Sequence, residues 1–148
     1  MPKVDLGRIE KVKRTGYPPP HDEQVRGRWA QRLGPAFDLS DFGANVTTLE
    51  PGAWSSQRHW HEGEDELVVM LEGEAVLVED EGETVLREGE IAVFPKGVPN
   101  GHHFINRSDL PCRLVAIGRT PSTVCHYSDI DMIVDPAVGF THRNGTPF

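Results

Sequence analysis

The chain has 148 residues, enough for one domain to bury a hydrophobic core without disulfides or structural metals. Its 23 acidic and 15 basic residues give a formal net charge of −8 at pH 7, which disfavours nucleic acid and anionic membrane surfaces as partners. The N-terminus has no basic segment followed by an apolar run, and no apolar run is long enough to cross a bilayer. We therefore expect a soluble, cytoplasmic protein.

Glycine and proline are frequent, with 15 and 12 copies. This composition suits many short strands joined by tight turns better than it suits long helices. The two cysteines, Cys112 and Cys125, do not form a C-x-x-C pair of the kind that binds zinc. A disulfide between them is one interpretation, but two buried thiols in a reducing compartment are the simpler one.

Residues 1–41 are interpreted as an irregular N-terminal extension of the same domain. The proline triplet at 18–20 cannot be helical and predicts a rigid extended segment. Within 22–33, three apolar side chains recur at every fourth position, a spacing typical of one helical face. We therefore expect at most one short helix in the extension, over 22–33.

From residue 42 onward, the pattern changes to short runs typical of β-strands. We expect strands at about 42–49, 56–61, 66–71, 74–79, 83–88, 90–94, 102–106 and 112–118, and one more at 123–127. Turn sequences separate these runs, which predicts a closed or two-sheet antiparallel architecture. We place the barrel core at 42–120 and expect 121–148 to supply a C-terminal strand and a tail that packs on the barrel.

Four of the seven histidines cluster in two of these expected strands. His59 and His61 are two residues apart in an extended run, so their side chains leave the same face. Glu66 begins the next strand after a short turn, which brings its carboxylate level with the two imidazoles. Two neutral imidazoles and one carboxylate form a facial metal site with open positions, and a histidine from 102–106 would complete the set. A histidine pair on a strand, taken alone, is more often structural than metal-binding.

The stretch 52–73 resembles the first cupin motif, G-x5-H-x-H-x3–4-E-x6-G. His59, His61, Glu66 and Gly73 match it in type and order. Gly52 lies one residue further from His59 than the motif requires.

The stretch 89–106 resembles the second cupin motif, G-x5-P-x-G-x2-H-x3-N. Gly89, Pro95 and Gly97 match in spacing, and His102 precedes Asn106 with three residues between them. Four residues instead of two separate Gly97 from His102, so the motif departs from its usual spacing at this point.

The resemblance covers about 42–120 and implies an all-β protein with a double-stranded β-helix (jelly-roll) cupin barrel. It also implies one divalent transition metal in the mouth of the barrel, of which iron, manganese, nickel, zinc and cobalt are the usual choices. The matching positions make His59, His61, Glu66 and His102 the expected ligands. The chain further resembles small bacterial cupins that are often loosely labelled sugar-phosphate isomerases.

Either His102 or His103 could supply the third imidazole, but neighbours on a strand face opposite sides, so only one of them can reach the metal. Counting back from Asn106 along the strand selects His102. A β-bulge at residues 100–101 would instead present His103. We predict His102, because extra residues are more easily absorbed in the preceding turn than in a strand.

The ligand set leaves the reaction open. An ion held by the protein in this way keeps positions for a chelating substrate, or for a substrate and dioxygen. We expect an enzyme, an isomerase, lyase or dioxygenase, that acts on a small oxygenated metabolite chelated to the metal. The alternative is a non-catalytic metal- or metabolite-binding module, since the same shell of ligands serves both roles.

Assembly is predicted from the strand at 66–71. Leu67, Val69 and Leu71 alternate along it and form an outward apolar stripe that needs cover. We expect a homodimer that buries the stripe. The alternative is that the N-terminal extension or the C-terminal tail covers it within one chain.

Overall fold

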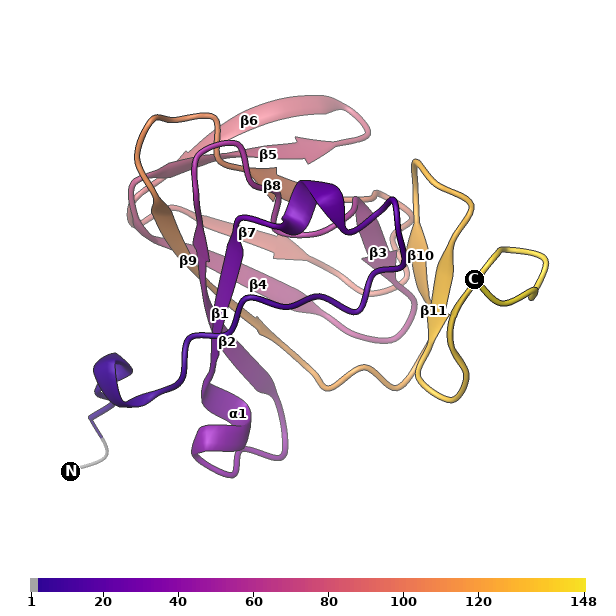
Figure 1. Ribbon diagram of the computed structural model, residues 1–148, viewed down its shortest axis with the longest axis horizontal. Helices are drawn as coiled ribbons and strands as arrows, with labels where there is room; N and C mark the ends of the chain where they lie inside the picture. Colours follow the sequence, from indigo (N-terminus) through magenta and orange to yellow (C-terminus); the bar gives the residue numbers. More distant parts are fainter. Residues whose placement is uncertain (1–2) are drawn as a thin grey trace.

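Antiparallel strands are the main regular structure of the molecule in Figure 1, a computed structural model that describes residues 3–148. The five-stranded sheet has the order β1-β2-β9-β4-β7, and two smaller sheets have the orders β6-β5-β8 and β12-β11-β10-β3. The strands are β1 Arg28–Arg32, β2 Gly43–Leu49, β3 His59–His61, β4 Glu66–Glu72, β5 Glu74–Glu79, β6 Gly82–Arg87, β7 Ile91–Phe94, β8 His103–Ile105, β9 Cys112–Gly118, β10 Cys125–Tyr127, β11 Ile133–Asp135 and β12 Gly139–Thr141. Short helical turns are η1 Leu6–Arg8, η2 Glu23–Val25 and α1 Leu33–Ala36.

The main hydrophobic core lies between the five-stranded sheet and the sheet β6-β5-β8. Strand β4 illustrates how the sequence builds it: Val68 and Met70 are buried at 2% and 1% exposure, while Leu67 and Val69 alternate with them and face outward. Leu77 of β5 and Phe104 of β8 meet this row from the other side. Successive side chains of β4 therefore alternate between the packed core and an apolar stripe on the outer face of the sheet.

The prediction of a helix over 22–33 is wrong. Only Glu23–Val25 forms a 3₁₀ turn, and Arg28–Arg32 is strand β1, paired antiparallel with β2. Gly27 lies between the two, where a Cβ would stand 2.8 Å from the Cβ of Ala53. The free edge of β2 offers a complete ladder of backbone hydrogen bonds, and this tertiary pairing overrides the local spacing of apolar side chains. The one α-helix within residues 3–148 is the single turn Leu33–Ala36.

The C-terminal segment contributes more regular structure than its turn-rich sequence indicates. Strand β10 pairs with β3, and β11 and β12 continue this small sheet outward (Figure 1). Cys125, Tyr127 and Met132 form a second small core, against which Tyr17 of the N-terminal segment packs. Part of the N-terminal segment therefore packs against the C-terminal segment beside β10. No helix within residues 3–148 is long and apolar enough to span a membrane.

Asn106 ties together the loops at the closed end of the core. Its side chain is fully buried, and its amide nitrogen donates hydrogen bonds to the carbonyl oxygens of Leu49 and Leu110, at 2.9 and 2.8 Å. Its amide oxygen accepts hydrogen bonds from the backbone and the hydroxyl of Ser108. One side chain thus satisfies the fully buried carbonyl of Leu49, which water cannot reach, and links it to the loop of Ser108 and Leu110.

We expect Asn106→Ala to lower the free energy of unfolding by about 2–3 kcal/mol, because buried carbonyl groups lose their donors. Urea denaturation measures the effect. Asn144→Ala is the matched control, since Asn144 accepts the same pair of local hydrogen bonds from Thr146 but is exposed to solvent. Its replacement should change stability by about 0.5 kcal/mol or less. Equal losses in the two variants would contradict the role of burial.

Candidate metal centre

The three-residue strand β3 lies between two chain segments that are distant in sequence. On one edge, the amide of His59 donates to the carbonyl of His102 at 3.2 Å, and the amide of His102 donates back to the carbonyl of His59 at 2.9 Å. Directly opposed residues of an antiparallel pair project to the same side. The backbone therefore places these two imidazoles side by side, with ring centroids 4.9 Å apart.

The other edge of β3 is paired with β10. Cys125 lies opposite His61, and Tyr127 lies opposite His59. His59 and His61 share one face of the strand, with ring centroids 4.9 Å apart. The thiol and the phenol from β10 therefore extend the polar surface that begins at His102.

Glu66 opens strand β4 and completes the cluster. Its Oε2 atom lies 3.1 Å from Nε2 of His102 and 3.6 Å from Nε2 of His61. His59, Glu66 and His102 offer ligand atoms that all lie within 4.8 Å of one another. The structure thus brings together all four side chains that the sequence selected, from β3, β4 and the residue that precedes β8.

His102 and His103 face opposite directions, as strand alternation requires. His102 is 3% exposed and stacks on Phe94 beside Glu66. His103 instead directs Nδ1 at the carbonyl of Ser56, at 3.0 Å, and packs edge-on against Trp54. The geometry therefore favours His102 as the imidazole of the cluster.

The loop before His102 accommodates the two residues that exceed the usual motif spacing. Gly97 has a φ of +73°, and its amide donates to the carbonyl of His61 at 2.8 Å, which anchors the start of the loop to β3. At Gly101, a Cβ would lie 1.9 Å from the hydroxyl of Ser128, so only glycine fits this close approach. The extra residues lie between these two anchors, and the register of His102 is unaffected.

Hydrogen bonds orient the ring of His59. Its Nδ1 lies 2.9 Å from the carbonyl oxygen of Gln57, which can only accept, so the proton is on Nδ1 and Nε2 keeps a lone pair. Burial, together with the neighbouring imidazole of His102, lowers the pKa of His59 to about 4. His59 is therefore neutral at physiological pH, which is the form that binds a metal.

The charges of the other groups favour a cation at the centre. Burial favours protonated Glu66, but hydrogen bonds from His102 and His61 outweigh burial and hold the pKa of this carboxyl well below its usual range. Burial likewise opposes a charge on His61, yet the neighbouring Cys125 and Glu66 raise its pKa to about 10. A proton on His61 thus balances the carboxylate, and a metal ion would supply the same positive charge.

The donor atoms fit a first-row divalent metal. Two buried ring nitrogens, Nδ1 of His61 and Nδ1 of His102, have no hydrogen-bond partner within residues 3–148. Buried polar atoms rarely lack hydrogen-bond partners. Because these two nitrogens have none, the rings can turn toward a bound ion without breaking a hydrogen bond at Nδ1. Three imidazoles and one carboxylate are a set suited to iron, manganese, nickel, zinc or cobalt.

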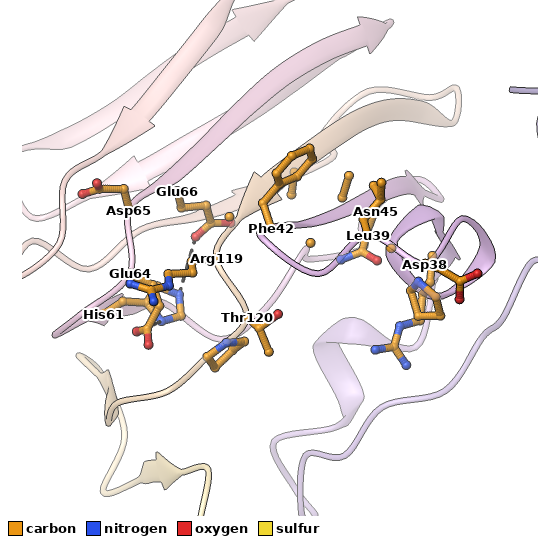
Figure 2. A pocket seen from close by; sticks show the side chains of 18 residues that line it. Asp38, Leu39, Phe42, Asn45, His61, Glu64, Asp65, Glu66, Arg119 and Thr120 are labelled. Atoms are coloured by element: carbon orange, nitrogen blue, oxygen red, sulfur yellow. Dashed lines mark ion pairs between the residues drawn. The ribbon is translucent and has the colours of Figure 1, made fainter. Parts of the chain in front are cut away.

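A pocket of about 580 Å³ opens at His61 and Glu66. Figure 2 shows these two side chains at one end, with Glu64 and Arg119 beside them, and Asn45 further along the pocket. Its volume is in the range of pockets that hold small metabolites. The candidate centre is thus accessible to a ligand from this side.

Glu64 shapes the wall of the pocket. It is 3% exposed and accepts hydrogen bonds from the backbone amides and the hydroxyls of Ser122 and Thr123. Burial favours its protonated form, but these hydrogen bonds outweigh burial and lower its pKa to about 2. The carboxylate therefore ties the segment after β9 to the β3–β4 turn. Neither sequence motif includes Glu64 among its defining residues.

Sequence reasoning also missed Arg32 and Arg119, which line the same pocket. Within residues 3–148, neither guanidinium has an ion-pair partner. Neither arginine belongs to a motif, and β1 and the end of β9 meet here only through tertiary structure. No sequence signal could have joined them to the site.

Comparison with known proteins identifies the family of the chain. A family model described as "Cupin domain" matches residues 45–118. No curated protein matches the chain. A crystal structure from Silicibacter pomeroyi, described as a sugar phosphate isomerase from a cupin superfamily, is 44% identical, with a TM-score of 0.93 over 99% of this chain and 96% of that one.

Two more distant structures share the fold alone. The polyketide cyclase RemF from Streptomyces resistomycificus is 20% identical, with a TM-score of 0.66 over 80% of this chain and 79% of that one. A Thermotoga maritima protein described as a predicted oxalate decarboxylase is 19% identical, with a TM-score of 0.58 over 79% and 97%. The expected all-β jelly roll is thereby confirmed, and the chain belongs to the cupin superfamily.

Proposed function

We propose that the chain is a metal-dependent enzyme that isomerises a small oxygenated metabolite. The observation that supports this most strongly is the convergence of ligand atoms from His59, Glu66 and His102, within 4.8 Å of one another, at the end of a metabolite-sized pocket. His61 lies 3.6 Å from the same carboxylate and is the fourth ligand. When bound, the divalent metal would act as a Lewis acid on substrate oxygens.

Residues around the centre have separate tasks. Glu66 supplies the anionic donor, and the carbonyl of Gln57 holds His59 in the tautomer that leaves Nε2 free. Arg32 and Arg119 line the pocket and form no ion pair with the acidic residues of 3–148, so they suit a phosphate or carboxylate on the substrate. Phosphate recognition agrees with the name of the Silicibacter protein, sugar phosphate isomerase, although that name describes the relative alone.

Three other functions remain as outcomes of the tests. The same ligands would suit a dioxygenase or a lyase, because open positions on the metal accept dioxygen or a chelating acid equally well. A non-catalytic module would bind metal and metabolite without turnover. We favour isomerisation of a phosphorylated substrate because Arg32 and Arg119 line the same pocket as His61 and Glu66 of the centre.

The ligand set can be tested by substitution under identical metal loading. We expect His102→Ala to lose most of the bound metal and Glu66→Gln to weaken metal affinity at least about tenfold, because an anionic or imidazole donor is removed. His103→Ala is the matched control and should keep its metal. Elemental analysis and thermal stabilisation by added metal measure both properties. Loss of metal in His103→Ala alone, or no metal in the parent protein, would contradict the proposed centre.

The reaction class can be tested with metal-loaded protein and a panel of aldose and ketose phosphates. Isomerisation predicts interconversion of an aldose and a ketose with incorporation of solvent deuterium, followed by nuclear magnetic resonance. Arg119→Ala should raise KM for phosphorylated substrates, whereas Arg113→Ala, an exposed arginine paired with Glu72 away from the pocket, should not. Consumption of dioxygen would indicate the dioxygenase, and tight binding without turnover would indicate the module.

The proposal includes a homodimer formed through the outer face of the five-stranded sheet. Leu67 and Val69 of β4 lie in register with Val93 and Ile91 of β7, which are 62% and 59% exposed. Leu71, at 39% exposure, extends the stripe. Within the described chain, neither the N-terminal segment nor the tail shields these β7 side chains, so the cover within one chain that the sequence left open is incomplete.

Light scattering should give about twice the chain mass of 16.5 kDa at micromolar concentration. Val93→Asp should shift the protein to monomer, because a charge in a buried apolar interface is costly. Val138→Asp is the control, since Val138 is 72% exposed on a distant turn. A parent protein of 16.5 kDa would disprove the dimer.

A further inference from the structure

Cys125 belongs to a second group of potential ligands beside the candidate centre. Its sulfur and ring nitrogens of His59 and His61 lie within 4.8 Å of one another. The side chain is 4% exposed, on β10, directly opposite His61 in the β3–β10 pairing. Directly opposed residues project to the same side of the sheet, so the thiol faces the same space as the imidazoles.

A separate cavity of about 270 Å³ adjoins this group. His59, His61, Cys125 and Tyr127 line it, whereas Glu66 and His102 do not. His61 also lines the larger pocket and therefore lies between the two spaces. Its Nδ1 atom is buried and has no hydrogen-bond partner within residues 3–148. A ring nitrogen without a partner, next to a thiol and a second imidazole, is the arrangement of a ligand site.

The other cysteine has quite different surroundings. Cys112 is fully buried on β9, in the main hydrophobic core with Leu49 and Leu114. Burial raises the pKa of its thiol to about 11, which keeps it protonated. Cys112 is therefore an ordinary core thiol and a natural reference for Cys125.

We propose that Cys125 is a further metal ligand, which supplies a thiolate to the centre together with His59 and His61. This inference rests on the proposed metal centre and extends its ligand set from nitrogen and oxygen to sulfur. As the sulfur–metal bond forms, the thiol releases its proton to solvent, in addition to the proton that His61 releases when its ring nitrogen binds the ion. A soft sulfur donor shifts preference toward zinc, cobalt or iron(II) and away from manganese.

Cobalt(II) is the probe for the test, because a thiolate bound to cobalt gives an intense charge-transfer absorption in the near ultraviolet. We expect this band in the cobalt-loaded parent protein and in Cys112→Ser, and its loss in Cys125→Ser. The ratio of zinc affinity to manganese affinity should also fall in Cys125→Ser, by about tenfold or more. Cys112→Ser should leave that ratio unchanged.

Alkylation of the unaltered protein gives a second readout that needs no variant. Zinc should protect Cys125 from iodoacetamide, as mapped by mass spectrometry, while the reactivity of Cys112 stays the same with and without metal. Equal labelling of Cys125 in both states would overturn the proposal.

The outcomes separate this inference from the function on which it rests. If cobalt binds but its absorption spectrum shows only the weak visible bands typical of nitrogen and oxygen ligands, Cys125 is not a ligand and the proposed metal centre still stands. No cobalt, zinc or other transition metal bound at all would refute both.

Discussion

The reciprocal backbone hydrogen bonds between His59 and His102 are the constraint on which the candidate centre depends. Strand β3 has three residues and could not hold its position alone. One edge is joined to His102 and the other to β10, so two distant segments hold it in place. This pairing places the two imidazoles side by side, while the carbonyl of Gln57 and the ring of Phe94 orient the rings of His59 and His102.

Burial gives the cluster its electrostatic character. Polar groups withdrawn from water interact more strongly with one another, but each must also find a partner. Glu64 meets this requirement through the amides and hydroxyls of Ser122 and Thr123, which closes the pocket wall. The carboxylate of Glu66 instead faces the imidazoles of His61 and His102. The carboxylate of Glu66 therefore needs a positive charge nearby, which a divalent cation satisfies as well as a proton does.

The strands of the barrel core were largely predictable because alternation of apolar side chains is a local signal. The expected runs at 66–71, 74–79 and 112–118 all lie in observed strands. The expected helix over 22–33 failed for a reason that is not local. Strand β1 exists because the edge of β2 was available for pairing, and no spacing within 22–33 contains that information.

The sequence by itself determined the jelly roll and the four residues His59, His61, Glu66 and His102, since motif spacing on strands decides which side chains share a face. It also favoured His102 over His103 through strand alternation. Only the tertiary structure decided which other groups surround this cluster. Cys125 lies opposite His61 because β10 pairs with β3, and Arg32 and Arg119 line the same pocket because β1 and the end of β9 both border it. Such contacts depend on how strands from distant parts of the chain pair, and local periodicity does not encode that pairing.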